Sequence, residues 1–297
     1  MPSVIENMSN ELAKMVELAG PAVVRVEGRR RMPASGIVWS KEGVIVTAHH
    51  VLERDDRLRV GFGGEEKVDA QLVGRDPSTD LAVLKTDQKG LTPAVWAELE
   101  GLKVGHLVLA VGRPGRTVQA TLGIVSALGT NWRTAAGGMV DRYLQTDVVM
   151  YPGFSGGALV DVEGKVLGLN TSALGGVSLT IPTSTVRRVT QALLTDGKVR
   201  RGYLGVGVQP VRLPDALVEE LGQETGLILV SVEPGSPADK GGLTLGDSLL
   251  SLDGNPLRRL DELLDLLSHD LVGREVALRI LRAGETREVK VKIGEHP

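Results

Sequence analysis

The chain contains no cysteine among its 297 residues. Disulfides, thiolate metal sites and a cysteine nucleophile are therefore excluded, and redox chemistry does not indicate the compartment. Aromatic residues make up only 3% of the chain, so Val, Leu, Ile and Ala must fill the interior. Because hydrophobic residues still reach 42% over this length, the sequence predicts folded cores and favours two domains.

Long apolar runs and nucleotide motifs are lacking too. No stretch approaches the ~18 apolar residues of a transmembrane helix, and no basic segment followed by an apolar core opens the chain. As it stands, the sequence predicts a cytoplasmic protein without an integral membrane segment, or an extracytoplasmic one if a leader has been removed. No G-x-x-x-x-G-K-[ST] run is present, so nothing indicates ATP chemistry.

A strong excess of one charge is also absent. The net charge is −3, which gives no indication of a nucleic-acid partner. The one short basic cluster, Arg29-Arg30-Arg31, is interpreted as a solvated loop.

Glycine, in contrast, is abundant, with 38 residues, about twice the usual ~7%. It indicates many tight turns. Strand-like segments follow one another with few helical patterns between them, at 22–26, 36–39, 44–48, 58–60, 70–73, 81–85, 107–111, 119–127, 142–146, 158–160, 166–172 and 177–181. This spacing is typical of antiparallel barrels or sandwiches, so the predicted fold class is mainly β.

Helical patterns mark two places in the chain. Residues 3–19 carry apolar side chains on one face, and Thr183 to Leu194 repeat that pattern. A break at Thr195-Asp196-Gly197-Lys198 then marks a boundary, so we predict one domain over 1–197 and a second over 198–297. The second is expected to be a small β-rich domain with two helices.

The most informative stretch is Gly153-Phe154-Ser155-Gly156-Gly157, which precedes an apolar strand. Glycines around a serine let the backbone turn tightly, so that its hydroxyl and nearby N–H groups converge. Acyl transfer needs such a nucleophile beside donors for an oxyanion. A glycine-rich loop with an idle serine is the alternative, and a histidine and a carboxylate elsewhere would decide against it.

The chain has five histidines, at 49, 50, 106, 269 and 296. His49 and His50 end the apolar run 44–48, where a general base would be rigidly held. The alternatives are a polar pair or a two-ligand metal site, but no third ligand accompanies them, so no metal and no cofactor are expected. Asp80 opens another apolar strand, where it needs a partner such as an imidazole N–H; the alternative is a turn or capping residue.

The order His, Asp, Ser is that of chymotrypsin-like proteases and not of α/β-hydrolases. At this level the resemblance becomes specific. The segments 47–51 (Thr-Ala-His-His-Val), 76–83 (Asp-Pro-Ser-Thr-Asp-Leu-Ala-Val) and 152–159 (Pro-Gly-Phe-Ser-Gly-Gly-Ala-Leu) resemble the signature blocks of the HtrA/Deg serine proteases. Further similar blocks are 123–128, 145–147, 181–182, 201–206 and 235–238, so that the resemblance covers nearly the whole chain.

The resemblance implies a chymotrypsin-like double β-barrel, a trypsin-like protease domain, followed by one PDZ domain. It also implies the roles of individual residues. His50, directly before Val51, would be the base, Asp80 the acid that orients it, and Ser155 the nucleophile. The backbone N–H groups of Gly153 and Ser155 would form the oxyanion hole.

Three features depart from the family pattern. Phe154 replaces the usual Asn before the nucleophile, and His49 replaces an Asn and remains a fallback base. The resemblance implies a homotrimer, against which the lack of any aromatic residue before Trp39 counts.

The expected S1 pocket would be apolar and small. Its residues are Val149, Met150, Asn170, Thr171 and Ser172. Val149 stands six residues before the nucleophile, where trypsin-like enzymes that select Lys or Arg carry an acid. We therefore expect cleavage after small or aliphatic residues.

In the PDZ segment, the loop at Tyr203-Leu204-Gly205-Val206 is expected to bind a peptide's C-terminal carboxylate. The peptide would add a strand beside a helix near 259–268. Leu204, Val206 and Leu264 would then contact its last apolar side chain. A β-domain that serves only for packing is the alternative.

The whole pattern predicts an ATP-independent serine endopeptidase that cleaves unfolded or misfolded proteins in protein quality control and the stress response. The alternative is a protease-like PDZ scaffold or chaperone that holds unfolded chains, with catalysis minor or lost. Expected partners are unfolded polypeptides and peptides with apolar C-termini, and no nucleic acid.

Overall fold

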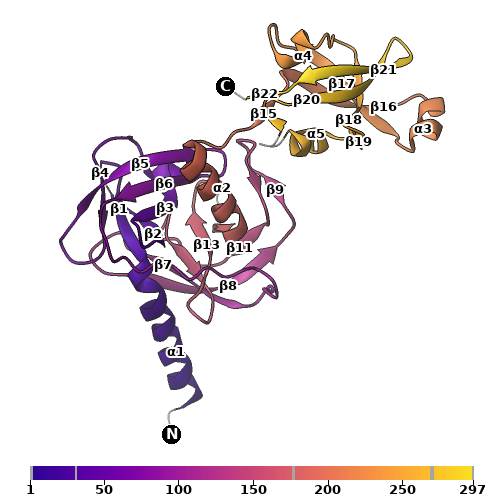
Figure 1. Ribbon diagram of the computed structural model, residues 1–297. Helices are drawn as coiled ribbons and strands as arrows, with labels where there is room; N and C mark the ends of the chain where they lie inside the picture. The colour runs from indigo at the N-terminus through magenta and orange to yellow at the C-terminus, as the bar shows by residue number, and fades with distance from the viewer. Residues whose placement is uncertain (1–2, 31, 176–177, 268–270, 296–297) are drawn as a thin grey trace. The chain divides into compact units, whose positions relative to one another are not determined.

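The computed structural model describes residues 3–30, 32–175, 178–267 and 271–295 (Figure 1). Arg31, Val177, Ser268, His269 and His296, which were named above, lie outside the described residues. The chain divides into two compact units, Met1–Val199 and Arg200–Pro297. The mainly β fold class is confirmed.

The first unit contains two closed antiparallel barrels of six strands each. The first barrel runs in the order β1-β2-β3-β6-β5-β4. Its strands are β1 (Val23–Glu27), β2 (Ala34–Ser40), β3 (Val44–Ala48), β4 (Leu58–Gly61), β5 (Val68–Asp76) and β6 (Leu81–Thr86). All five residues of β3 are buried, which explains its continuous apolar run.

The second barrel runs in the order β11-β14-β13-β12-β7-β8. Its strands are β7 (Leu107–Gly112), β8 (Gln119–Leu128), β11 (Leu144–Thr146), β12 (Ala158–Val160), β13 (Val166–Thr171) and β14 (Leu179–Pro182). A small hairpin of β9 (Trp132–Arg133) and β10 (Met139–Val140) lies outside the barrel order.

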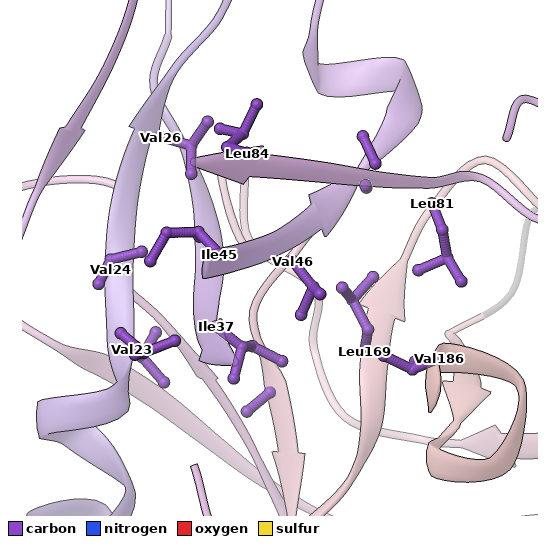
Figure 2. Packing of buried hydrophobic residues seen from close by; sticks show 14 of the residues in the cluster. Val23, Val24, Val26, Ile37, Ile45, Val46, Leu81, Leu84, Leu169 and Val186 are labelled. Carbon is purple, nitrogen blue, oxygen red and sulfur yellow. The ribbon is translucent and has the colours of Figure 1, made fainter. Parts of the chain in front are cut away.

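One apolar cluster joins the two barrels. Figure 2 shows side chains of the first barrel, such as Val46 and Leu81, close to Leu169 on β13 and Val186 on α2. Because strands of both barrels contribute to this cluster, the line along which they meet is held by apolar packing.

Two helices flank the barrels. In α1 (Val4–Ala19), which begins with a Ser3–Glu6 capping box, only Met15 and Ala19 are buried. The helix continues into a 3-10 turn, η1 (Gly20–Ala22). Helix α2 (Thr183–Asp196) buries one face against β5 and β6 of the first barrel and β13 of the second. No helix in the described ranges has the length and apolar character needed to cross a bilayer.

The second unit is built around a sheet in the order β16-β17-β18-β20-β21. Its strands are β16 (Val206–Arg212), β17 (Thr225–Val232), β18 (Ser248–Leu252), β19 (Asn255–Pro256, paired with β18), β20 (Glu275–Arg282) and β21 (Glu285–Lys292). The short strands β15 (Gly202–Tyr203) and β22 (Gly294–Glu295) pair with each other.

The described part of this unit has three helices, one more than the sequence predicts. They are α3 (Asp215–Leu221), α4 (Pro237–Lys240) and α5 (Leu260–Leu266). The unexpected helix is α3, which has no buried residue. With only seven residues, it spans about two turns, which is too short for a helical period to stand out in a sequence.

Candidate active site

Ser155 lies in the loop between β11 and β12, and its glycines are required by the backbone. Gly153 has a φ of 92° and Gly156 a φ of 86°, in the left-handed region that side chains disfavour. A Cβ at Gly156 would also come within 2.1 Å of the Ser35 carbonyl oxygen. The loop can therefore press against β2 only because a glycine follows the serine.

His50 and Asp80 are brought together by neighbouring strands of the first barrel. His50 lies in a 3-10 turn, η2 (His49–Val51), directly after β3, and Asp80 directly precedes β6. Because β3 and β6 pair with Ala48 opposite Leu81, the two residues meet at the same end of the barrel.

The Asp80 carboxylate, which is almost fully buried, holds His50 at two points. Its Oδ1 accepts the backbone N–H of His50 at 2.8 Å, and its Oδ2 lies 2.8 Å from His50 Nδ1. A carboxylate can only accept, so Nδ1 carries the proton and Nε2 is left as an acceptor. Thr171 on β13 donates its hydroxyl to the same Oδ2 at 2.5 Å. This geometry prepares the imidazole to take up a proton.

Asp80 also has a φ of 58°, which is uncommon for a residue with a side chain. Its carbonyl accepts the N–H of His49 at 3.0 Å. Backbone and side chain of Asp80 are thus both engaged by the histidine turn, which compensates for the strained backbone.

The Ser155 hydroxyl shares a cleft with His50 but is hydrogen-bonded elsewhere. Its Oγ lies 3.1 Å from Ser172 Oγ, and no hydrogen bond joins Ser155 to His50 in the described part of the chain. His50, Ser155 and Ser172 all line the cleft. The hydroxyl and the imidazole thus line one cleft without a hydrogen bond between them among the described residues.

Two backbone donors are free beside the serine. Among the described residues, neither the Gly153 N–H nor the Ser155 N–H has an acceptor in the protein. The loop that carries them is fixed from β2, because Ser35 donates its hydroxyl to the Gly153 carbonyl at 2.7 Å and its N–H to the Ser155 carbonyl at 3.1 Å. Phe154 is fully buried and anchors the same loop in the second barrel.

Of the five residues expected to form S1, only Met150 and Ser172 line the cleft, together with Tyr151 and Pro152. Asn170 is fully buried and bonds to the Ala158 carbonyl. Thr171 is buried against Asp80. Val149 is 54% exposed, and its carbonyl accepts the Thr121 hydroxyl.

His49 lies apart from the cleft lining. Its Nδ1 is 3.5 Å from Arg75 Nη1, and burial together with this guanidinium lowers the pKa of His49 below its usual value. No cluster of three or more potential metal ligands occurs among the described His, Asp and Glu side chains.

In the second unit, the expected carboxylate loop lies between β15 and β16. Gly205 has a φ of 78°, and the N–H groups of Leu204 and Gly205 have no acceptor within the described residues. Strand β16 forms one edge of the sheet, and α5, which carries Leu264, contacts it. Leu204 is buried, whereas Val206 and Leu264 are half-buried.

Residues 34–169 match the model of the trypsin-like peptidase domain, and residues 202–293 match that of the PDZ domain. The solved structure of the HtrA-type protease AlgW with a decapeptide is similar to this chain at 30% identity and a TM-score of 0.81. That similarity covers 96% of this chain and 98% of the other. The chain belongs to the HtrA family of serine proteases.

Further relatives agree with this membership. The serine endoprotease from Yersinia pestis is 31% identical, with a TM-score of 0.79 over 96% of this chain and 98% of that one. The probable periplasmic serine endoprotease DegP-like of Ectopseudomonas mendocina is 34% identical over 304 residues, 99% of this chain and 64% of that protein. Its counterpart in Chlamydia trachomatis is 33% identical over 280 residues, which cover 92% of this chain and 56% of that protein. The HtrA-family chain thus spans between 56% and 64% of the length of these two curated relatives.

Sequence reasoning missed two supporting residues of this HtrA-family site. Ser35, which fixes the loop around Ser155, is 118 residues from Gly153, and no spacing rule links them. Thr171 was expected in the S1 pocket, whereas its hydroxyl points to an aspartate 91 residues away.

Proposed function

We propose that this HtrA-family chain is a serine endopeptidase in which His50, Asp80 and Ser155 form the catalytic triad. The observation that carries the proposal is the pair of bonds from His50 to Asp80, which leaves Nε2 as a base in the same cleft as Ser155. A base oriented by a carboxylate, next to a serine with free backbone donors, fits acyl transfer.

In the proposed reaction, Ser155 Oγ leaves Ser172, gives its proton to His50 Nε2 and bonds to the peptide carbonyl carbon. The resulting oxyanion accepts hydrogen bonds from the N–H groups of Gly153 and Ser155. Asp80 stabilises the resulting imidazolium. The C–N bond then breaks as Nε2 gives this proton to the leaving amine. Water, deprotonated by the same nitrogen, bonds to the acyl carbon, and the ester bond breaks as Nε2 returns the proton to Ser155 Oγ.

Covalent labelling with a fluorophosphonate probe tests the triad. The probe needs an activated serine and an oxyanion hole, so we expect one adduct, located by mass spectrometry on Ser155. The variants Ser155→Ala and His50→Ala should both abolish it. Labelling that survives in His50→Ala, or an adduct on another serine, would contradict the assignment.

We further propose a preference for small or aliphatic P1 residues. Met150 supports it, since its apolar side chain lines the cleft, and the residue six before Ser155 is Val149 and not an acid that could pair with Lys or Arg. A peptide library with varied P1 tests this, with cleavage after Val, Ala, Leu or Ile expected. Preferred cleavage after Lys or Arg would refute it.

The PDZ unit is proposed to bind apolar C-termini. The free N–H groups of Leu204 and Gly205 and the edge position of β16 support this, since a peptide can add to such an edge as a further strand. The related AlgW structures contain a decapeptide or a tripeptide. Titration with a peptide ending in an apolar residue should give saturable binding, which amidation of its C-terminus abolishes.

Unfolded or misfolded proteins are the proposed substrates, cleaved without ATP. A chaperone-like scaffold with minor catalysis is the second candidate, supported by a serine that is bonded to Ser172 and not to His50. Degradation of casein by the wild type but not by Ser155→Ala favours the protease. Suppression of aggregation by Ser155→Ala with no cleavage by the wild type favours the scaffold.

The domain limits 1–197 and 198–297 and the homotrimer remain proposals of the same kind. The compartment stays a prediction as well: the sequence as it stands predicts the cytoplasm, whereas the curated relatives are named periplasmic.

A further inference from the structure

A band of basic side chains borders the active-site cleft on the first barrel. We call it the arginine groove. It consists of two adjoining hollows lined by Arg25, Glu27, Arg29, Arg30, Pro33, Glu53, Arg54, Asp56, Arg57, Arg59 and Lys67. Seven cations face three carboxylates there, which leaves four net positive charges in a chain whose net charge is −3.

Two of the four net positive charges lie around Glu27, which is surrounded by three cations. Its carboxylate is bonded by Arg25 at 2.5 Å, Lys67 at 2.6 Å and Arg59 at 3.0 Å. Burial alone would raise the pKa of Glu27, but the hydrogen bond from Lys67 and the charges of all three cations hold it below its usual value. Glu27 therefore stays ionised, and two positive charges remain uncompensated around it.

Of the other four cations, Arg57 pairs with Asp56 at 3.6 Å, whereas the remaining three are not neutralised by a carboxylate. Within the described residues, Arg29, Arg30 and Arg54 form no ion pair with a carboxylate. Arg29 donates its Nε to the Met32 carbonyl at 2.5 Å, and Arg54 donates Nη2 to the Arg57 carbonyl at 3.2 Å. Guanidinium groups fixed in this way lose little freedom when an anion binds.

The arginine groove is continuous with the catalytic cleft, because Arg29 and Glu53 line both. Met150 and Ser172, which also line that cleft, belong to the second barrel. A substrate with its P1 side chain at Met150 and its carbonyl at Ser155 leaves the cleft past His50, which protonates the leaving amine. The segment after the scissile bond thus runs toward Arg29.

We propose that the arginine groove binds acidic side chains of the substrate on the leaving-group side, at about the second to fourth residue after the scissile bond, given ~3.3 Å per extended residue. The inference rests on the proposed endopeptidase function. Glu53 stands at the near end of the groove, so an acid directly after the scissile bond gains nothing. A nucleic acid fits less well, because no aromatic side chain lines the groove for base stacking.

Fluorogenic peptides with Val at P1 test the proposal on the full chain. In one series, two Asp, two Asn or two Lys occupy positions between the second and the fourth residue after the scissile bond. In a second series, the same pairs stand before the scissile bond. We expect about fivefold higher kcat/KM for Asp over Asn in the first series only, a size typical of exposed ion pairs in a focused field. The gain should shrink as NaCl rises from about 0.05 to about 0.5 M, because the charges are screened.

Charge reversal provides the sharper test. In the double variant Arg29→Glu/Arg30→Glu, the Asp-to-Lys ratio of kcat/KM should invert. The matched control Lys41→Glu/Lys89→Glu makes the same change of charge at two exposed sites outside the groove, and its ratio should stay at the wild-type value. Because the readout is a ratio within one variant, a general loss of activity does not disturb it.

The possible outcomes distinguish a failure of the groove proposal from a failure of the proposed endopeptidase function. If the fluorophosphonate labels Ser155 and the Asn peptides are cleaved, but Asp brings no gain or an equal gain before the scissile bond, only the groove proposal is overturned. If the probe fails to label Ser155, the endopeptidase itself fails. Inhibition by a single-stranded oligonucleotide, lost in Arg29→Glu/Arg30→Glu and without any Asp preference, would assign the groove to nucleic acid instead.

Discussion

Thr171 holds the acid of the site from the second barrel, while the histidine that this acid orients belongs to the first. Its hydroxyl donates to Asp80 Oδ2, the oxygen that also faces His50 Nδ1. A hydrogen bond to a charged group typically contributes about 1.5–3 kcal/mol. The position of Asp80, and through it that of the imidazole, therefore depends on a side chain of the other barrel.

Thr171→Val keeps the shape of the side chain and removes this donor. We expect kcat/KM to fall about tenfold to a hundredfold, since 1.4 kcal/mol corresponds to a factor of ten. The matched control is Thr180→Val on the neighbouring strand, a buried threonine that bonds to Asn170 and not to the triad. Equal losses in both variants, measured with one peptide substrate, would show that Thr171 is merely structural.

Ser172 is the hydrogen-bond partner of the proposed nucleophile, Ser155. In Ser172→Ala the Ser155 hydroxyl loses its partner at 3.1 Å, and a neutral hydrogen bond contributes about 0.5–1.5 kcal/mol. We expect fluorophosphonate labelling to become about twofold to tenfold faster, with Ser172→Thr, which keeps the hydroxyl, close to the wild type. Slower labelling of the alanine variant would mean that Ser172 assists the serine.

At the scale of elements, α2 packs on strands from both barrels. Within this helix, Leu193 is fully buried on the packed face, and the adjacent Leu194 is 38% exposed. Leu193→Ala should lower the free energy of unfolding by about 2–5 kcal/mol, because a buried cavity remains. Leu194→Ala should change it by less than about 1 kcal/mol. Urea denaturation followed by tryptophan fluorescence compares the two, and similar losses would contradict the packing of α2.

The elements themselves were largely predictable from the sequence, because each carries its own pattern. The run 44–48 matches β3, and the stripe within 183–194 falls in α2. Local patterns do not show how the barrels close. They do not say which strands pair to complete a barrel or which side chains then come into contact. Ser35 and Gly153 come together only after both barrels have formed, so the support of the nucleophile loop was not predicted.

The triad candidates were identified from sequence blocks that resemble those of the family. The structure adds the hydrogen bonds that hold their side chains. The S1 expectation was less informative. Asn170 and Thr171 lie on β13 with side chains buried among strand partners. Since successive side chains on a strand alternate between faces, neighbouring residues do not share one wall, and a sequence number alone cannot assign them.

At the scale of the whole molecule, each unit contains a buried carboxylate held by cations. In the second unit it is Asp247, bonded to Arg282 on two sides. Burial alone would raise the pKa of Asp247, but hydrogen bonds from Arg282 and Thr244 hold it below its usual value. A carboxyl whose pKa is lower in the folded state stabilises the fold at pH values above about 4, and this contribution is lost as the pH falls through the folded pKa.

Asp247→Asn should therefore destabilise the second unit at pH 7 by about 1–3 kcal/mol and have little effect near pH 2. Hydrogen exchange read by mass spectrometry on peptides from 200–297 measures this unit in the intact chain. Peptides from residues 1–199, where Glu27 has the equivalent role, serve as the internal control and should not change at pH 7. A loss at Asp247→Asn that is the same at both pH values would refute the linkage.

The proposed nucleophile and its proposed base belong to different barrels: Ser155 to the second, His50 and Asp80 to the first. For a protease of the proposed kind, activity therefore depends on the joint between the barrels as well as on each barrel. Any change that displaces one barrel from the other separates Ser155 from His50, even where every strand keeps its partners. The apolar cluster that joins the barrels thus also sets the distance across which the proposed reaction takes place.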